Sequence, residues 1–546
     1  MNVVRRFATA TVLSASLVVV AGCSSPAPAP PRSTGSGSDA ASSAAAATAS
    51  ASASASAGAA ATSAPVLEPL PAAIPADLQR YYSQKLTWTS AGCDPGFQCA
   101  TMKVPLDYAN PGSGSDDISL AVVRRTSSGQ GSQHLGSLLV NPGGPGGSAI
   151  DYAEYAATSF PAVIRNAYDI VGMDPRGVNR STPVTCLTNQ QMDTFSATDT
   201  TPDSQSEINT LVAADKTFAQ GCKQRSGDLL GHVSTVEAAK DMDVLRALLG
   251  DAKLNYLGKS YGTFLGATYA GLFPSRVGHL VLDGAMNPSL DALQLDSQQA
   301  GGFETAFNAF AADCVKQSSC PLGSTTQQAG TKLDALFASW DKHPLSTDSP
   351  SRTLDEALGT TGVISAMYDQ GEWPTLRAAL NQAVNGNGSG LLALSDEYYE
   401  RSASGQYQNL MAANAAVNCL DLAPAATTPQ EVEQQLPTYR KASPHFGTTL
   451  AWSGLSCSSW PVKPTGEPHT IPAKGAAPIL VVGTTRDPAT PYAWAQALAA
   501  QLDSGTLLSF NGDGHTAYER GSSCVDGDVN TYLLTGRTPA KGTMCD

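Results

Sequence analysis

Short aliphatic runs bounded by turn residues recur along the chain and predict buried strands. Each run has four to eight residues, which suits a strand in the interior of a sheet and is too short for a buried helix. The runs that we assign as strands are residues 100–104, 118–124, 136–140, 168–173, 254–257, 277–284, 478–483 and 506–510.

Segments with helical spacing lie between these runs. Residues 235–249 carry apolar side chains three or four positions apart and stop at Gly250, a residue typical of helix ends. Further helices are predicted over 264–273, which ends before a proline, and around 494–502. Strands that alternate with helices indicate an α/β fold with a doubly wound, mostly parallel sheet.

The alternation is interrupted once and then resumes, which defines the expected domains. Helical pattern without strands fills residues 287–456, so we expect an inserted helical cap there. The α/β core is predicted in two parts, 66–286 and 457–546. Residues 23–65 are rich in Ala, Ser and Pro and predict a disordered tether. Residues 1–22 are expected to be a signal peptide.

The stretch 254–263, Leu-Asn-Tyr-Leu-Gly-Lys-Ser-Tyr-Gly-Thr, joins a strand to a helix through Gly-x-Ser-x-Gly. This is the sequence context of a nucleophile elbow, a sharp turn that presents a serine hydroxyl above the sheet. Gly258 and Gly262 suit it because a Cβ at either position would collide with a neighbouring element. We therefore predict that Ser260 is a catalytic nucleophile.

A glycine-rich segment follows the strand 136–140. Its sequence, Asn-Pro-Gly-Gly-Pro-Gly-Gly-Ser over 141–148, lacks both the Gly-Lys-Ser/Thr ending of a phosphate loop and the dinucleotide-binding spacing. It suits an oxyanion loop, since glycines let backbone N–H groups gather around one point. We predict Gly143 and Gly144 in this role, with the backbone N–H of Tyr261 as a second donor. The alternative is an ordinary turn.

An acid and a base are expected after late strands of such a sheet, in the order serine, acid, histidine. Asp487 follows the strand 478–483, and His515 follows the strand 506–510. His515 would take the proton of Ser260, and Asp487 would hold the imidazole and stabilise its cation. Asp513 is a rival acid, but it lies only two residues from the histidine in the same tight loop. These residues need no metal and no cofactor, and we predict none.

The net charge of −14 leaves no basic stripe for phosphates, which argues against a nucleic-acid partner. The N-terminus instead indicates export. Arg5 and Arg6 precede a short apolar run that ends in Val-Ala-Gly-Cys at 20–23, which resembles a bacterial lipobox. Cys23 is therefore the expected lipidation site and the anchor to an extracytoplasmic membrane surface. An ordinary signal peptide with an incidental cysteine is the alternative.

The remaining cysteines support an oxidising compartment. Ten are left once Cys23 is set aside, and no two of them have Cys-x-x-Cys spacing, so a disulfide framework is expected rather than a zinc site. Sequence alone does not determine the connectivity. Our hypothesis is that neighbours in the sequence pair with one another.

With these residues in place, most of 66–546 resembles the secreted tripeptidyl and prolyl aminopeptidases of the α/β-hydrolase superfamily. Two residues depart from that pattern: Lys259 stands where a small residue is expected, and Asn179 where glycine is usual. The segments that carry the resemblance are 141–148, 174–183 (Asp-Pro-Arg-Gly-Val-Asn-Arg-Ser-Thr-Pro), 258–262, 273–277, 282–284 and 512–515.

The resemblance implies cleavage of peptides from a free N-terminus, with the cap closing over the substrate's amine. An ammonium group needs a carboxylate in a partly dry pocket. The resemblance points to Asp421 for this role, with Glu372 and Asp369 as weaker candidates; each could instead be an ordinary solvated carboxylate of the cap. A carboxylesterase or lipase on the same fold, and a non-catalytic surface-binding lipoprotein, are the competing readings of the whole chain.

Overall fold

The computed structural model describes residues 65–546 except 113, 115 and 130. The predicted signal peptide 1–22, the lipidation site Cys23 and the tether up to residue 64 lie outside the described residues. In the part of the chain that is described, no helix is both long enough and apolar enough to cross a membrane.

The described residues form one sheet with strand order β1-β2-β4-β3-β5-β6-β7-β8-β9. The pairs β1–β2 and β2–β4 are antiparallel and all others are parallel, so the predicted α/β class is confirmed. The strands are β1 (Gln98–Val104), β2 (Ile118–Arg125), β3 (Ser137–Asn141), β4 (Asp169–Met173), β5 (Leu254–Lys259), β6 (Val277–Asp283), β7 (Ile479–Arg486), β8 (Gly505–Asp513) and β9 (Met544–Cys545).

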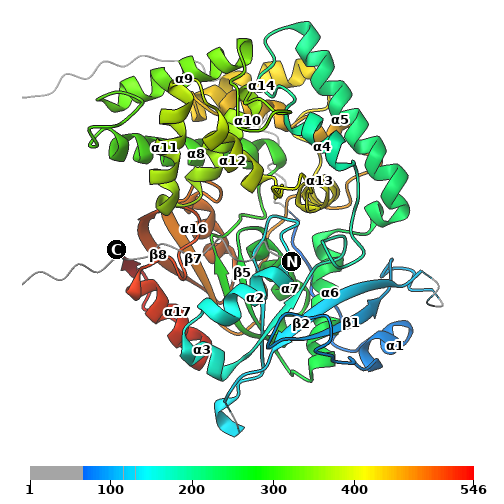
Figure 1. Ribbon diagram of the computed structural model, residues 1–546. Helices are drawn as coiled ribbons and strands as arrows, with labels where there is room; N and C mark the ends of the chain where they lie inside the picture. The colour runs from blue at the N-terminus through cyan, green and yellow to red at the C-terminus, as the bar shows by residue number, and fades with distance from the viewer. Residues whose placement is uncertain (1–64, 113, 115, 130) are drawn as a thin grey trace, which may run out of the picture. The chain divides into compact units, whose positions relative to one another are not determined.

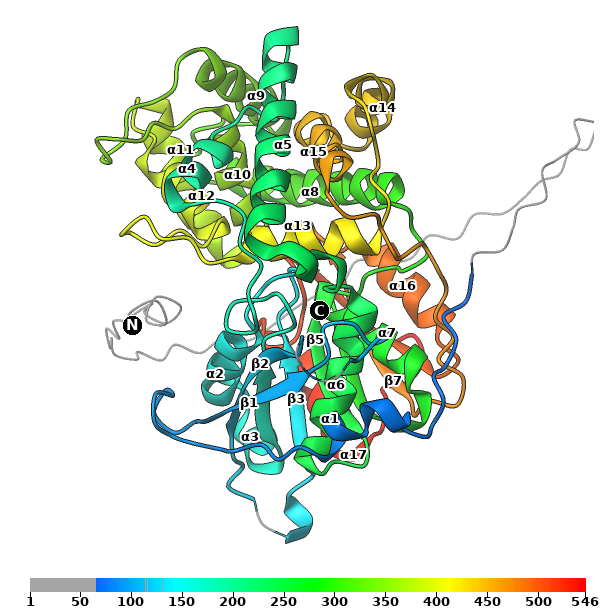
Figure 2. The same cartoon turned by 90° about the vertical axis from the view of Figure 1, so that its right-hand side faces the viewer.

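Helices cover both faces of this sheet because both faces of its central strands are apolar. Leu138 and Val140 of β3 pack towards one layer, and Leu139 packs towards the other. Figure 2 shows α2 and α3 on one side of the strands and α6 and α7 on the other. The first layer contains α2 (Ala149–Ser159), α3 (Ala162–Ala167) and α17 (Ser523–Thr535); the second contains α1 (Gln79–Ser83), α6 (Thr235–Leu249), α7 (Tyr261–Leu272) and α16 (Tyr492–Gln501).

A helical cap lies beyond one end of the strands (Figure 1). It occupies the segment between β6 and β7 and has its own core around Phe307, Trp340 and Trp373. Its helices are α8 (Ala292–Cys314), α9 (Thr326–Lys342), α10 (Glu356–Met367), α11 (Trp373–Val384), α12 (Ser389–Tyr398), α13 (Leu410–Asp421), α14 (Pro429–Ala442) and α15 (Gly447–Ser453).

Two helices from the first part of the core also belong to the cap. They are α4 (Asn189–Ser196) and α5 (Gln205–Ser226), and Figure 2 shows α5 running alongside the cap helices. Ile208 and Leu211 of α5 share a buried cluster with Tyr439 and Trp452. The cap is therefore wider than 287–456. An amphipathic helix shows in its sequence that it buries one face, but not against which partner.

Five disulfides join the ten cysteines, and each joins neighbours in the sequence, which confirms the predicted pairing. They are Cys93–Cys99, Cys186–Cys222, Cys314–Cys320, Cys419–Cys457 and Cys524–Cys545. Two of them fix the cap: Cys314–Cys320 closes the end of α8, and Cys419–Cys457 joins α13 to the connection that leads back to the sheet.

Candidate active site

Ser260 stands at the turn between β5 and α7. Its φ of 55° and ψ of −127° lie in a region that side chains other than glycine rarely occupy. The two glycines of the elbow are tightly enclosed: a Cβ on Gly258 would lie 2.3 Å from the carbonyl oxygen of Gly262, and one on Gly262 would lie 2.8 Å from Oδ1 of Asn141. The local chain therefore has the strained, crowded geometry of a nucleophile elbow.

Asp487 and His515 lie together after β7 and β8. Nδ1 of His515 is 2.8 Å from Oδ1 and 3.0 Å from Oδ2 of Asp487. Three backbone N–H groups also donate to this carboxylate, from Ala489, Thr490 and Thr516, at 2.8 to 3.0 Å. The acid is thus fully buried and held from several sides, and it fixes the orientation of the imidazole.

The other ring nitrogen of His515, Nε2, is buried and has no hydrogen-bond partner among the described residues. The histidine and the serine approach the same point at the end of β6. The backbone N–H of Ser260 donates to the carbonyl of Asp283 at 2.9 Å. A Cβ on the next residue, Gly284, would lie only 3.3 Å from Cε1 of His515. Glycine suits this position because its φ is 70° and because Thr490, His515 and Thr516 crowd it.

The glycine-rich loop lies directly against the elbow. A Cβ on Gly143 would lie 2.9 Å from the Tyr261 backbone nitrogen and from Cβ of Ser260. The N–H of Gly143 itself donates to Oδ1 of Asn141 at 2.9 Å. No partner is recorded for the N–H of Gly144 among the described residues. The two predicted loop glycines therefore differ: Gly143 brings the loop close, and Gly144 retains an available donor.

The Asp-Pro-Arg-Gly segment after β4 supports this loop. Asp174 accepts hydrogen bonds from Oγ of Ser148 (2.7 Å) and the N–H of Ile150 (3.1 Å), which fixes the end of the glycine-rich loop at the start of α2. Arg176 is buried and binds both oxygens of Asp241 on α6, at 2.7 and 2.8 Å. Asn179 has a φ of 41°, which explains why glycine would serve there equally well.

The cap contacts both the glycine-rich loop and the loop that carries His515. The carbonyl of Tyr368, just after α10, accepts the backbone N–H of His515 at 2.8 Å, and Nδ2 of Asn414 on α13 donates to the carbonyl of Pro145 at 3.1 Å. A Cβ on Gly146 would lie 2.6 Å from the carbonyl of Leu410. Any substrate must therefore reach Ser260 beneath or between cap helices.

Asp421, at the end of α13, lies close to the elbow, and its carboxylate is already hydrogen-bonded to Thr235. Its carboxylate accepts the N–H of Thr235 at 3.0 Å and the hydroxyl of Thr235 at 2.5 Å. The same hydroxyl is 2.5 Å from the hydroxyl of Tyr261. Burial raises the pKa of Asp421 to about 6. A carboxylate has about four lone-pair sites, so two remain for another donor.

Glu372 belongs to the short segment Gln370–Glu372 that follows Tyr368. Burial raises the pKa of Glu397 on α12, and the charge of Glu372 raises it further, so the two carboxylates lie near one another. Glu397 is exposed on α12, as a glutamate in a helical pattern normally is, so nothing in the sequence sets it apart. Asp369, the weaker candidate, pairs with Arg520 at 3.0 Å.

The rival acid Asp513 is occupied elsewhere. Arg486 binds both of its oxygens, Nε at 2.6 Å and the terminal nitrogen at 3.0 Å. No contact between Asp513 and the imidazole of His515 is recorded among the described residues. Asp487 is thus the carboxylate that meets the histidine.

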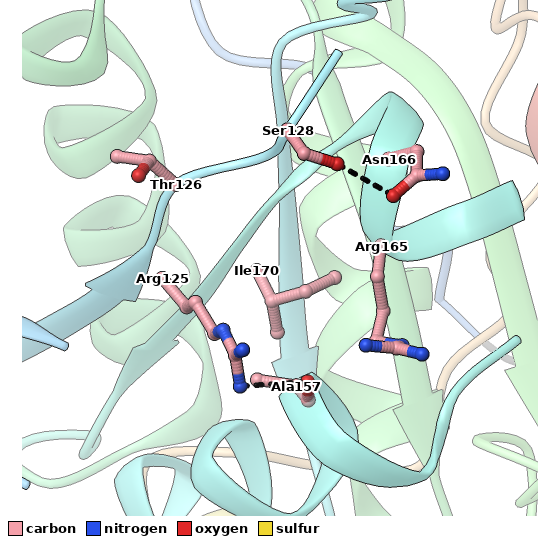
Figure 3. Close-up of a pocket in the computed structure, with 7 residues that line it drawn as sticks. All are labelled: Arg125, Thr126, Ser128, Ala157, Arg165, Asn166 and Ile170. Carbon is pink, nitrogen blue, oxygen red and sulfur yellow. Dashed lines mark hydrogen bonds between the residues drawn. The ribbon is translucent and has the colours of Figure 1, made fainter. Parts of the chain in front are cut away.

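A hollow of about 100 Å³ lies apart from these residues, between the end of β2 and the start of β4 (Figure 3). Arg125 and Arg165 point into it. Each has a partner at the C-terminal end of α2: Arg125 donates to the carbonyl of Ala157 at 3.1 Å, and Nε of Arg165 donates to that of Phe160 at 2.7 Å. We interpret this polar hollow as a helix-capping arrangement, since cations favour the negative end of a helix dipole.

Comparison with known proteins finds relatives that are named as peptidases and as an esterase. A family model described as "TAP-like protein" matches residues 443–545. The chain is 38% identical to serine protease Hip1 of Mycobacterium tuberculosis over 82% of this chain and 87% of that protein. It is 39% identical to a protein of the same species named carboxylesterase B, covering 82% and 86%. It is 34% identical to tripeptidyl aminopeptidase of Streptomyces lividans, covering 82% and 83%.

Solved structures of α/β hydrolases match more distantly. One is proline iminopeptidase of Mycobacterium smegmatis, with 16% identity and a TM-score of 0.32 over 80% of this chain and 93% of that one.

Proposed function

Because the chain belongs to the tripeptidyl aminopeptidase-like family of serine hydrolases, we propose that it is a lipid-anchored extracytoplasmic exopeptidase that releases short peptides or residues from free N-termini. One observation carries the catalytic part of this proposal. The Asp487–His515 pair leaves Nε2 of the imidazole buried and without a partner among the described residues, on a loop that meets the segment of Ser260 at the end of β6.

In the proposed mechanism, Oγ of Ser260 attacks the scissile carbonyl while Nε2 of His515 takes its proton. Asp487 stabilises the resulting imidazolium through Nδ1. The backbone N–H groups of Gly144 and Tyr261 donate to the oxyanion that forms. The imidazolium then protonates the leaving amine. Water, activated by the same histidine, releases the acyl group from Ser260.

The exopeptidase specificity rests on the cap. Helices contact both the oxyanion loop and the histidine loop, so a chain that continues in both directions past Ser260 would meet the cap. Carboxylates beneath such a cover suit a free ammonium group, because a charge-assisted hydrogen bond is strong where water is scarce. Asp421 and Glu372 are the carboxylates that we propose for this role, and Glu397 lies near the second of them.

The proposed location rests on the N-terminal sequence and the disulfides. Five disulfides in a chain of 546 residues suit an oxidising compartment outside the cytoplasm. Cleavage at the lipobox-like run before Cys23 would leave that cysteine as the lipidated first residue. The residues after it would then link a catalytic domain to the membrane surface.

Carboxylesterase activity is a second candidate function, favoured by the 39% identity to a relative of that name. The proposed triad would attack an ester as readily as an amide. The two functions differ in what the cap recognises: an ammonium group requires a carboxylate beside the substrate, whereas an acyl chain requires an uninterrupted apolar channel.

Product analysis tests the proposal directly. The purified chain is incubated with a library of free-amine and N-acetylated peptides, and with short-chain esters, and the products are identified by mass spectrometry. Release of N-terminal fragments from free-amine peptides and not from N-acetylated peptides is the expected result. Ser260→Ala should lose this activity by about 10⁴-fold or more while remaining folded. Hydrolysis of esters without any peptide cleavage would favour the carboxylesterase instead. A folded Ser260→Ala protein with normal turnover would contradict the triad.

A further inference from the structure

A buried pair of opposite charges lies directly behind the proposed nucleophile. Lys259 is the last residue of β5 and Asp283 the last of β6, and the two are register partners in adjacent parallel strands. Nζ of Lys259 is 3.7 Å from Oδ2 of Asp283. The side chain of Asp283 is fully buried, and that of Lys259 is 14% exposed. Lys259 is also the residue at which the elbow departs from the small side chain expected there.

Both members of the pair bind the loop that carries His515. The two oxygens of Asp283 accept the N–H groups of Ala517 (2.9 Å) and Tyr518 (3.0 Å). Nζ of Lys259 donates to the carbonyl of Tyr518 at 2.8 Å. The backbone of Asp283 holds the other catalytic segment, since its carbonyl accepts the N–H of Ser260. The pair thus connects the nucleophile's segment to the base's loop.

The histidine loop needs such support because its backbone is strained. Thr516 and Glu519 have φ values of 67° and 62°, in the left-handed region that favours glycine. Non-glycine residues remain there only where the surroundings hold the chain in place. Asp487 holds one side of the loop through the N–H of Thr516, and the Lys259–Asp283 pair holds the other.

Burial makes the two charges depend on one another. It lowers the pKa of Lys259 and raises the pKa of Asp283, which opposes both charges. Their mutual attraction and the hydrogen bonds from the loop oppose this tendency. The charge of His515, which lies on the loop that Asp283 binds, also lowers the pKa of Asp283. The other charged groups on elements around His515 are Asp487, Glu519, the Arg520–Asp369 pair and the Arg486–Asp513 pair.

We propose that Lys259 and Asp283 form a positioning pair for the catalytic base. Together they hold the 513–519 loop so that His515 faces Ser260, and their opposite charges cancel at the imidazole. Neither residue touches the substrate. This inference rests on the proposed function, because it assumes that His515 is the base for Ser260.

The pH profile of kcat/KM separates this role from a purely structural one, since its acid limb reports the pKa of the free enzyme's base. Asp283→Asn leaves the charge of Lys259 uncompensated, which disfavours the imidazolium, so the limb should move to lower pH. Lys259→Met leaves the charge of Asp283, so the limb should move to higher pH. Each shift should be about half a pH unit or more. In the double variant the limb should return towards the wild-type position.

Asp243→Asn is the matched control, because Asp243 is an equally buried carboxylate, paired with Arg246 at 2.8 Å on α6. It should lower the melting temperature without moving the acid limb. A small neutral ester is the substrate, so that peptide recognition does not enter. In the double variant kcat should fall about 10- to 100-fold, because loss of the loop contacts displaces the base.

Acid limbs that stay in place, or that move in the same direction in both single variants, would overturn the proposal. A single variant with an unpaired buried charge could fail to fold; the double variant carries no such charge and remains a test, and wild-type kcat in it would also refute the pair. Failure of the proposed function is distinguishable from these outcomes. It would appear as activity that survives Ser260→Ala, whatever the pair does.

Discussion

The ring of Tyr368 stands edge-on against the imidazole of His515, with the ring centroids 5.4 Å apart and an angle of 85° between the planes. Tyr368 belongs to the cap, and its backbone carbonyl also accepts the N–H of His515. The cap therefore contributes to the environment of the proposed base as well as covering it. A movement of the cap should therefore change the position of the imidazole.

Replacing this ring should weaken catalysis without unfolding the protein. Tyr368→Leu keeps the backbone hydrogen bond but removes the edge-to-face contact and leaves space beside His515. We expect kcat to fall about ten-fold on both ester and peptide, because a small displacement of the base affects both reactions. Tyr368→Phe keeps the ring and should remain near wild type. Equal rates for Tyr368→Leu and wild type would show that the contact has no catalytic effect.

The two candidate acids can be separated by a pair of matched substitutions. Asp487→Asn should lower kcat by about 10⁴-fold, because an amide favours the wrong tautomer of His515 and cannot stabilise its cation. Asp513→Asn breaks only the contact with Arg486, so it should change kcat by less than about three-fold. Steady-state kinetics on one ester substrate measures both. The reverse ranking would make Asp513, at the end of β8, the acid in place of Asp487.

Much of this site could be predicted because its information is local in the sequence. An apolar run, a turn and a helix start are adjacent around Ser260, and Asp487 and His515 each follow a recognisable strand. Parallel strands that end at one edge of a sheet then bring such residues together without knowledge of side-chain packing. The disulfide pairing could be predicted for the same reason, because each disulfide joins cysteines that are neighbours in the sequence.

Other features depend on long-range packing and could not be predicted. The helical pattern of α5 does not reveal that its apolar face meets Trp452. The two loop glycines cannot be distinguished until Asn141 is seen to accept the N–H of Gly143. Lys259 can be singled out from the sequence because it stands where the family has a small residue. Its partner Asp283 can be identified only from the register of β5 and β6.

Asn179 offers a test of backbone strain. Its φ of 41° suits glycine, so Asn179→Gly should change the free energy of unfolding by less than about 1 kcal/mol, even though the contact of its side chain with Gln408 is lost. Asn179→Val forces a β-branched side chain into the same conformation and should cost about 1–3 kcal/mol. Denaturant unfolding of both variants measures the difference. A glycine variant less stable than the valine variant would contradict this explanation.

Membrane anchoring depends on residues outside the described part of the chain and is tested separately. Cys23→Ser removes the thiol that would receive the lipid, so the variant should be released in soluble form or should keep its signal peptide. Fractionation and mass spectrometry of the mature N-terminus measure both outcomes. Ser24→Ala is a matched neighbour that should remain anchored. A Cys23→Ser protein that is still processed and membrane-bound would require another anchor.

The role of Asp421 can be determined by comparing substrates with and without a free amine. If Asp421 receives the ammonium group, Asp421→Asn should lower kcat/KM for free-amine peptides by about 10- to 100-fold, which corresponds to a charge-assisted bond of about 1.5–3 kcal/mol. N-acetylated peptides and a small neutral ester should respond much less. An asparagine can keep both contacts with Thr235, because its oxygen accepts the N–H and its amide donates to the hydroxyl.

The pH dependence adds a second, independent criterion. The pKa of Asp421 is raised to about 6, so the carboxylate is ionised above that pH and becomes neutral as the pH falls through it. Only the ionised form can pair with an ammonium group, so KM for free-amine peptides should rise below about pH 6 in the wild type. In Asp421→Asn, KM should be higher but independent of pH over the same range.

The alternative role for Asp421 is to support the elbow, because its carboxylate is linked to the hydroxyl of Tyr261 through the hydroxyl of Thr235. If Asp421→Asn and Thr235→Val both lower kcat for ester and peptide alike, with KM unchanged, Asp421 supports the elbow, and Glu372 with Glu397 becomes the better candidate for the amine.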